Sequence, residues 1–319
     1  MKGENVMRTK MKGKIGLIMT AAITIGAVSG CGIFDSNDKE NETTTIVADQ
    51  IKDTTSDDNN IGGISQEETT TAPEEETSHE KVTFENDVNA ISNEKITWGV
   101  GVQVNADNRP VAPVNLQETY GSKYAVDWIK EDEKVVYLTF DEGYENGYTS
   151  HILDTLKEKN VKAVFFITMP YAKSEQELVK RMIDEGHIVG SHSVTHPSAG
   201  MMSLSVEQQM NEYKELHQYV LDTYGYEMWL FRPPTGAFSE QTLAVANYCG
   251  YRSVMWSFAY ADWDPANQME IGKALDNAVT KLHNGAVYLL HAVSKTNTEM
   301  LGDFIDKARE KGFEFKSYN

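Results

Sequence analysis

Short apolar runs alternate with amphipathic stretches from about residue 135 to the end of the chain. The runs, such as VVYLTF, are rich in β-branched and aromatic residues, and the stretches between them repeat apolar residues three or four positions apart. Strands that alternate with helices predict a parallel sheet, because each helix carries the chain back to start the next strand. The expected strands lie at 135–140, 161–168, 187–193, 228–232, 251–258, 286–291 and 313–318, and the expected helices at 148–160, 174–186, 205–225, 239–248, 267–283 and 297–311.

About seven parallel strands separated by helices predict an α/β fold, a single distorted (β/α) barrel. We therefore interpret residues 96–319 as one domain, with residues 96–134 as an N-terminal extension packed on it. A length of 319 residues would also allow two domains, at about 150 residues each. The unbroken alternation of strands and helices favours a single domain.

Residues 1–31 have the order of a secretory signal. A basic start is followed by an apolar run from Ile15 to Val28, which is short for a membrane-spanning helix of about 20 residues. The sequence VSGC at the end of this segment resembles a bacterial lipobox. We therefore expect Cys31 to be lipidated and to hold the protein at the outer face of the cytoplasmic membrane, facing the cell wall. An uncleaved signal anchor is the alternative, and it places the protein on the same side.

Residues 32–95 are rich in Thr, Asp, Glu and Asn and have no sustained periodicity. They contain too few apolar residues to offset the entropy of ordering, so we expect a disordered acidic linker. Of the formal charge of −19, this segment carries −13, residues 1–31 carry +4 and the rest carries −10. Such a chain is not a nucleic-acid binder that works by neutralising phosphates. Because most of the charge lies in the linker, it says little about the substrate.

Polar side chains follow several of the predicted strands at the point where each strand ends. The carboxyl ends of parallel strands meet at one rim, which is where barrels of this kind place their chemistry. The residues expected at this rim are Asp141, Glu142, His192, His196, Arg232, Asp262 and His291.

His192 and His196 are four positions apart, so both imidazoles can face one point. Two neutral imidazoles and a carboxylate leave an open position on a divalent metal ion, which suits hydrolysis. Of the adjacent acids Asp141 and Glu142, one can bind the metal while the other acts as a general base on a water molecule. Arg232, in FRPPTG, needs a carboxylate partner if it is buried, and Asp141 is a natural one. Each motif alone is also compatible with loop histidines or a solvated strand end.

His291 interrupts an apolar strand, AVYLLH, at its last position. It is either a core histidine with its hydrogen bonds satisfied or a general acid at the rim. Asp262 could orient His291 and raise its pKa through its negative charge. The neighbouring Trp263 offers an apolar wall for a small acyl group.

The motifs TFDEG, HSVTH, FRPPTG, ADW and LLH, in this order, resemble the five motifs of the polysaccharide deacetylases with the NodB-homology fold, carbohydrate esterase family four. The match covers about 135–318. The longer strings WGVGVQVNADNRPVAP, TFDEGYENGYT, SFAYADWD and LLHAVSKTN look most like the muramic-acid deacetylases that prepare the delta-lactam of spore cortex peptidoglycan during sporulation. The resemblance implies a metal-dependent hydrolase that removes N-acetyl groups from peptidoglycan amino sugars.

The resemblance also implies a role for each residue. Asp141 would be the base, held by Arg232, and His192 and His196 would bind the metal. Asp262 would tune His291, the acid that protonates the leaving amine. The residues expected to line the acetyl pocket or contact the substrate are Trp263, Leu289, Tyr144, Pro234 and Gly236.

Two positions depart from the family pattern. Glu142 stands where the family usually has a second Asp, its third metal ligand. Glu is one methylene longer, so it could bind the metal after a small shift, bind through water, or not bind. The muramic-acid subgroup commonly lacks Asp there, so the change favours that subgroup. Ala259 replaces an Asp that often precedes Asp262, and we expect this loss to affect substrate fit.

These observations predict one divalent metal ion, with zinc favoured by the two histidines and one carboxylate, and cobalt, manganese or magnesium still open. We expect a monomer that acts on glycan strands after an amidase has removed their stem peptides. An N-acetylglucosamine deacetylase acting on peptidoglycan or chitooligosaccharides is the enzymatic alternative. A catalytically weak glycan-binding lipoprotein, in which Glu142 abolishes metal binding, is the alternative from another class.

Overall fold

The computed structural model describes residues 88–319. The signal segment, the lipidation of Cys31 and the linker up to residue 87 lie outside the described residues and stay predictions. Within residues 88–319, no helix is both long and apolar enough to span a membrane.

The centre of the fold is a parallel sheet, with β8 paired to β2 beside the main strand order β1-β6-β5-β4-β3-β2-β7. The prediction of a distorted parallel barrel is confirmed; β1, in the N-terminal extension, adds a strand too short to give a periodic signal. The strands are β1 (Val126–Asp127), β2 (Val135–Glu142), β3 (Ala163–Ile167), β4 (Ile188–Ser191), β5 (Leu230–Phe231), β6 (Arg252–Val254), β7 (Ala286–His291) and β8 (Glu314–Phe315).

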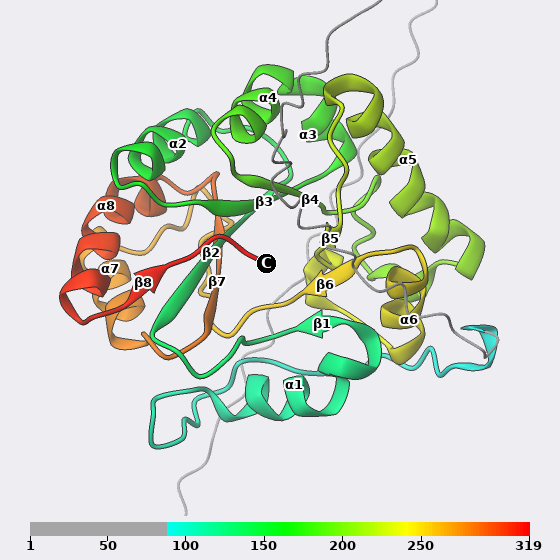
Figure 1. The fold of residues 1–319 in the computed structure, drawn as a ribbon, viewed down its shortest axis with the longest axis horizontal. Helices are drawn as coiled ribbons and strands as arrows, with labels where there is room; N and C mark the ends of the chain where they lie inside the picture. Colours follow the sequence, from blue (N-terminus) through cyan, green and yellow to red (C-terminus); the bar gives the residue numbers. More distant parts are fainter. Residues whose placement is uncertain (1–87) are drawn as a thin grey trace, which may run out of the picture. The chain divides into compact units, whose positions relative to one another are not determined.

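Helices surround the strands on the outside, as Figure 1 shows. The predicted helix 174–186 corresponds to one helix at 176–184. A short helix at 169–174, which was not predicted, precedes it, and Glu175, at φ −113° and ψ 42°, separates the two. The helices are α1 (Val111–Tyr124), α2 (Thr149–Glu158), α3 (Met169–Ser174), α4 (Gln176–Asp184), α5 (Val206–Tyr224), α6 (Glu240–Tyr248), α7 (Ile271–Thr280) and α8 (Lys295–Glu310).

The register of β2 sets the site. This strand lies between β3 and β7 and places Asp141 directly beside His291 of β7. A parallel bridge between Phe258 and Tyr288 joins the segment after β6 to the middle of β7. The chain that follows this bridge, with Asp262, is thereby brought to the carboxyl end of β7.

The core beneath the site is tightly packed. Phe140 of β2 and Phe165 of β3 stack with ring centroids 5.2 Å apart, and both are fully buried. Burial of a side chain of this size stabilises the fold by roughly 1.5–3 kcal/mol. This burial helps to hold β2, which carries Asp141, against β3.

The N-terminal extension begins earlier than the sequence suggested. Residues 88–95, assigned above to the linker, pack on the domain: Gln241 donates its backbone N–H to Ser92 O at 3.0 Å, and Ser239 Oγ bonds Asn93 Oδ1 at 2.9 Å. A segment this short cannot show a periodic hydrophobic pattern, so the sequence did not reveal that residues 88–95 belong to the domain.

Trp98, further along the extension, supports a loop of the site. Its indole Nε1 donates to Gly236 O at 2.8 Å, and its ring lies 5.0 Å from that of Trp256. Gly236 has φ +66°, and a Cβ there would lie 2.3 Å from the Trp256 ring, so only glycine fits.

Candidate active site

A cavity of about 700 Å³ opens at the carboxyl ends of the strands. Most of the residues that the sequence assigned to the site line it, although Arg232, Asp262, Pro234 and Glu142 do not. The predicted residues in the lining are Asp141, His192, His196, His291, Tyr144, Gly236, Trp263 and Leu289. Trp263 and Tyr144 are 60% and 52% exposed, so their rings are open to a ligand.

Asp141 is held by a buried cation. Arg232 donates from Nη1 to Asp141 Oδ1 at 2.8 Å, and its remaining donors bind the carbonyl oxygens of Val254 and Met255 at 3.0 and 3.1 Å. Burial alone would raise the pKa of Asp141, but the positive charge of Arg232 and its hydrogen bond, with the charge of protonated His291, outweigh it. The pKa of Asp141 therefore lies below its usual value, and the carboxylate is ionised at neutral pH.

His192 is neutral and fixed in orientation. Its Nδ1 lies 2.9 Å from the carbonyl oxygen of Arg232, an acceptor, which assigns the proton to Nδ1 and leaves Nε2 as a lone-pair donor 3.5 Å from Asp141 Oδ2. Burial lowers the pKa of His192 to about 4. The exposed His196 ring lies 4.8 Å from the His192 ring, between centroids.

The loop that carries these histidines depends on Glu212 of α5, which sequence analysis missed. Its carboxylate accepts the backbone N–H groups of Val194 and Thr195, both at 2.8 Å, and the Thr195 hydroxyl at 2.7 Å. An acid on the buried face of a helix is the signal that could have revealed this role, because a buried carboxylate needs donors.

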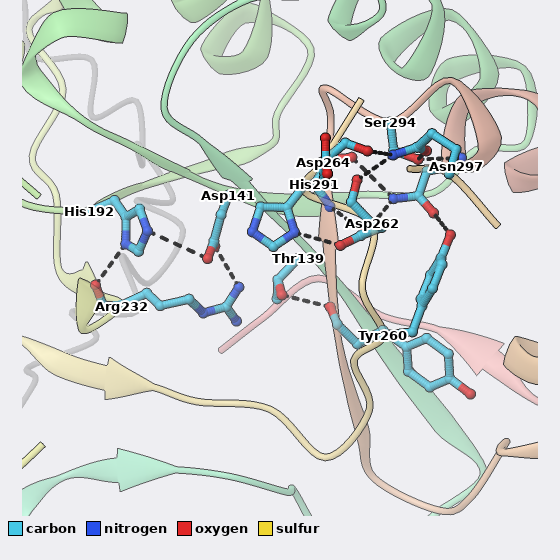
Figure 2. A network of polar contacts seen from close by, with 12 residues as sticks. Thr139, Asp141, His192, Arg232, Tyr260, Asp262, Asp264, His291, Ser294 and Asn297 are labelled. Carbon is cyan, nitrogen blue, oxygen red and sulfur yellow. Dashed lines mark hydrogen bonds and ion pairs between the residues drawn. The ribbon is translucent and has the colours of Figure 1, made fainter. Parts of the chain in front are cut away.

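His291 is paired with Asp262, as Figure 2 shows. Asp262 Oδ1 lies 2.8 Å from His291 Nδ1, and Oδ2 accepts the His291 backbone N–H at 2.9 Å. Burial on its own lowers the pKa of His291, but the hydrogen bond and charge of Asp262, with the charge of Asp141, outweigh burial. The pKa of His291 therefore lies above its usual value.

Glu142 is not at the cavity. Successive side chains of a strand point to opposite faces, and Glu142 is completely buried near Thr149 and Tyr171. Its carboxylate oxygens have no hydrogen-bond partner among the described residues. Burial raises the pKa of Glu142 well above its usual value, and the charges of Glu145 and Asp141 add to this. The structure thus separates Glu142 from the histidines it was expected to join.

The donor set fits a metal ion only in part. A histidine that is neutral, anchored through Nδ1 to a carbonyl oxygen and open at Nε2 is typical of metal ligands, and His192 meets these conditions. The described residues contain no group of three His, Cys, Asp or Glu side chains arranged to hold a metal. Among the described residues, His192 and His196 are therefore two candidate imidazole ligands, and Glu142 does not lie with them at the cavity.

Replacing Glu142 with Gln tests this placement. A raised folded-state pKa means that the stability conferred by the neutral carboxyl is fully present below pH 4.5 and is lost as pH rises toward that pKa. We expect the advantage of Glu142→Gln in unfolding free energy to grow between pH 5 and pH 8, measured by urea denaturation, with kcat changed less than about twofold. Weaker metal binding in the variant would instead assign Glu142 as a ligand.

The chain is similar in sequence to known proteins. The family model named polysaccharide deacetylase matches residues 129–254. The peptidoglycan-N-acetylmuramic acid deacetylase PdaA of Bacillus subtilis (strain 168) is 40% identical over 230 residues, which cover 72% of this chain and 86% of that protein. An uncharacterized 30.6 kDa protein of Geobacillus stearothermophilus is 42% identical over 230 residues, covering 72% of this chain and 85% of that protein.

The fold is similar as well. The solved structure of Bacillus subtilis PdaA, described as a family 4 carbohydrate esterase, aligns with a TM-score of 0.67 and 40% sequence identity. The alignment covers 71% of this chain and 96% of that one.

Proposed function

Because the chain belongs to the polysaccharide deacetylase family and is a carbohydrate deacetylase, a hydrolase, we propose that it removes the acetyl group from N-acetylmuramic acid in peptidoglycan. The action of PdaA on that sugar, given by its name, supports this substrate. The product amine would lead to the muramic delta-lactam of spore cortex.

The observation that carries the mechanism is the pair formed by Asp141 and His291. They lie side by side on β2 and β7, and both line the cavity. Their surroundings shift the two pKa values in opposite directions, so that Asp141 is ionised and His291 retains its proton toward higher pH. Two neighbouring groups held in opposite protonation states are the mark of an acid and base pair.

In the proposed reaction, Asp141 takes a proton from the water molecule that attacks the acetamide carbonyl. Arg232 keeps the Asp141 carboxylate ionised and fixed. His291 then gives its proton to the departing amine nitrogen, which releases acetate and a free amino sugar. Asp262 holds His291 Nδ1, so Nε2 is left to face the amine.

We propose that His192 and His196 hold the divalent metal ion, with zinc favoured on the chemistry of two imidazoles. When bound, such an ion supplies Lewis acidity and lowers the pKa of water. Trp263, Tyr144 and Leu289 would line the sugar and acetyl positions, because they line the cavity around Asp141 and His291. Pro234 and Gly236 would shape the cavity loop that Trp98 supports.

We further propose that the protein works outside the cytoplasmic membrane, where peptidoglycan lies, held by a lipid on Cys31 and the acidic linker. The basic and apolar order of residues 1–31 supports export. The catalytic domain would begin near residue 88, where the extension first contacts the barrel. We expect it to act as a monomer on glycan strands already stripped of stem peptides by an amidase.

Product analysis tests the substrate. The full chain is incubated with amidase-treated and untreated peptidoglycan, and mass spectrometry of the digested strands identifies the sugar that has lost an acetyl group. We expect loss from muramic acid, and mainly after amidase treatment. Loss from N-acetylglucosamine would contradict the proposed substrate. Binding to the glycan without release of acetate would support the catalytically weak binding protein.

A further inference from the structure

The carboxylate of Asp262 is enclosed by nitrogen donors from two different segments. It is 1% exposed, and the His291 backbone and imidazole occupy one side of it. The other contact comes from Asn297, whose Nδ2 donates to Asp262 Oδ2 at 2.6 Å and to the carbonyl oxygen of His291 at 3.1 Å. One amide group thus binds both members of the Asp262 and His291 pair (Figure 2).

Asn297 owes its position to the start of α8. Ser294 caps this helix by accepting the Asn297 backbone N–H at 3.0 Å, which sets Asn297 in the first turn with its side chain directed back to the site. Ser294 in turn bonds Gln268, and Gln268 Nε2 donates to the carbonyl oxygens of Asp262 and Asp264 at 2.9 and 2.7 Å. The segment around Asp262 and the first turn of α8 are therefore tied together.

Tyr260 decides which way the Asn297 amide points. Its hydroxyl bonds Asn297 Oδ1, so that the NH₂ group is the end that faces Asp262. Burial raises the pKa of Tyr260, and the negative charge of Asp262 adds to this, so the hydroxyl keeps its proton and remains a donor. The reversed amide would set Oδ1 against the Asp262 carboxylate, which is electrostatically unfavourable.

We propose that Asn297, oriented by Tyr260, is a positioning residue that locks the rotation of the Asp262 carboxylate, so that Oδ1 stays opposed to Nδ1 of His291. The inference rests on the proposed role of His291 as the acid. An amide N–H neither accepts nor loses a proton at neutral pH, so Asp262 remains a pure acceptor and Nδ1 keeps its hydrogen. Nε2 is then always the nitrogen that exchanges a proton with the substrate.

Asn297→Ala and Tyr260→Phe test the proposal, with Thr298→Ala as the matched control. Thr298 is the next residue of the same turn, and among residues 88–319 its hydroxyl bonds only Ser294 O, at 3.0 Å. The full chain is labelled for NMR and the imidazole of His291 is titrated without substrate; the charged groups around it are Asp262, Asp141 and Arg232. The pH dependence of kcat and KM is then measured on peptidoglycan strands.

We expect the pKa of His291 in Asn297→Ala to fall by about one unit, because a carboxylate that rotates and meets water holds the imidazolium less well. The alkaline limb of kcat should move down by the same amount, with kcat about tenfold or more lower and KM within about twofold. Tyr260→Phe, which removes one oxygen and should fold even if Asn297→Ala does not, should shift the His291 pKa in the same direction by less. Thr298→Ala should match the wild type.

An unchanged His291 pKa in both variants would overturn the proposal and leave Asn297 a packing residue. A rise would overturn it too, since it would mean that Asn297 acts only by withdrawing charge from Asp262. The titration needs no turnover. A wild-type chain that releases no acetate but shows the expected pKa shifts in the variants would therefore reject the proposed function and keep the positioning role.

Discussion

Replacing Asp141 with Asn is expected to lower kcat for acetate release by at least about a hundredfold, the usual scale of losing a positioned general base. Asn is nearly isosteric and its amide oxygen can still accept from Arg232 Nη1, so the shape of the cavity should be kept. The amide cannot take a proton from water at any pH of the assay. Acetate release from amidase-treated strands measures the loss.

Thermal unfolding is the control for this variant, because a loss of activity through misfolding would lower the melting temperature sharply. The fluorescence of tryptophans near the cavity, Trp256 and Trp263, offers a second check on its structure. An Asp141→Asn protein that folds and retains more than about a tenth of wild-type kcat would reject Asp141 as the base.

Replacing Arg232 with Met is expected to lower the free energy of unfolding by about 3–5 kcal/mol at neutral pH, because it leaves the buried Asp141 charge without its cation. Without Arg232, burial raises the pKa of Asp141 above its unfolded-state value. Ionised Asp141 then destabilises the fold instead of stabilising it. Stability should then be partly recovered at low pH, where Asp141 is protonated, and lost as pH rises. Urea denaturation at several pH values measures both effects.

A double variant separates the charge from the packing of Arg232. If the uncompensated carboxylate causes the loss, then adding Asp141→Asn to Arg232→Met should restore a large part of the stability. Arg232 also lies over the Phe166 ring, at 4.3 Å, and binds two carbonyl oxygens, and that part of the loss should stay. Strictly additive losses would show that the pair contributes nothing as a pair.

The rim residues could be predicted from the sequence because parallel strands place their carboxyl ends together. The pairing of Asp141 with Arg232 and of His291 with Asp262 was expected, and the structure shows both contacts. What the strand pattern could not supply is register. The position of Asp141 directly beside His291 depends on how β2 and β7 align, and nothing local to either strand sets that.

Other features of the site and fold were not predicted from the sequence, for different physical reasons. Glu142 was grouped with Asp141 by sequence adjacency, although the alternation of side chains along a strand already places neighbours on opposite faces. Asn297 and Tyr260 carry no periodic signal, and they meet Asp262 only because three segments converge in space. The short helix α3 was not predicted, because its six residues are too few for a periodic hydrophobic pattern to show.

The contact between Trp98 and Gly236 bears on how small a working enzyme of this kind can be. The family model begins at residue 129, yet the indole that supports the cavity loop lies 31 positions earlier, and His291 lies beyond the end of the match. The residues that identify the family therefore span a shorter range than the residues that build and support the cavity. A fragment trimmed to residues 129–254 would lose both the indole that supports the cavity loop and His291, the proposed proton donor.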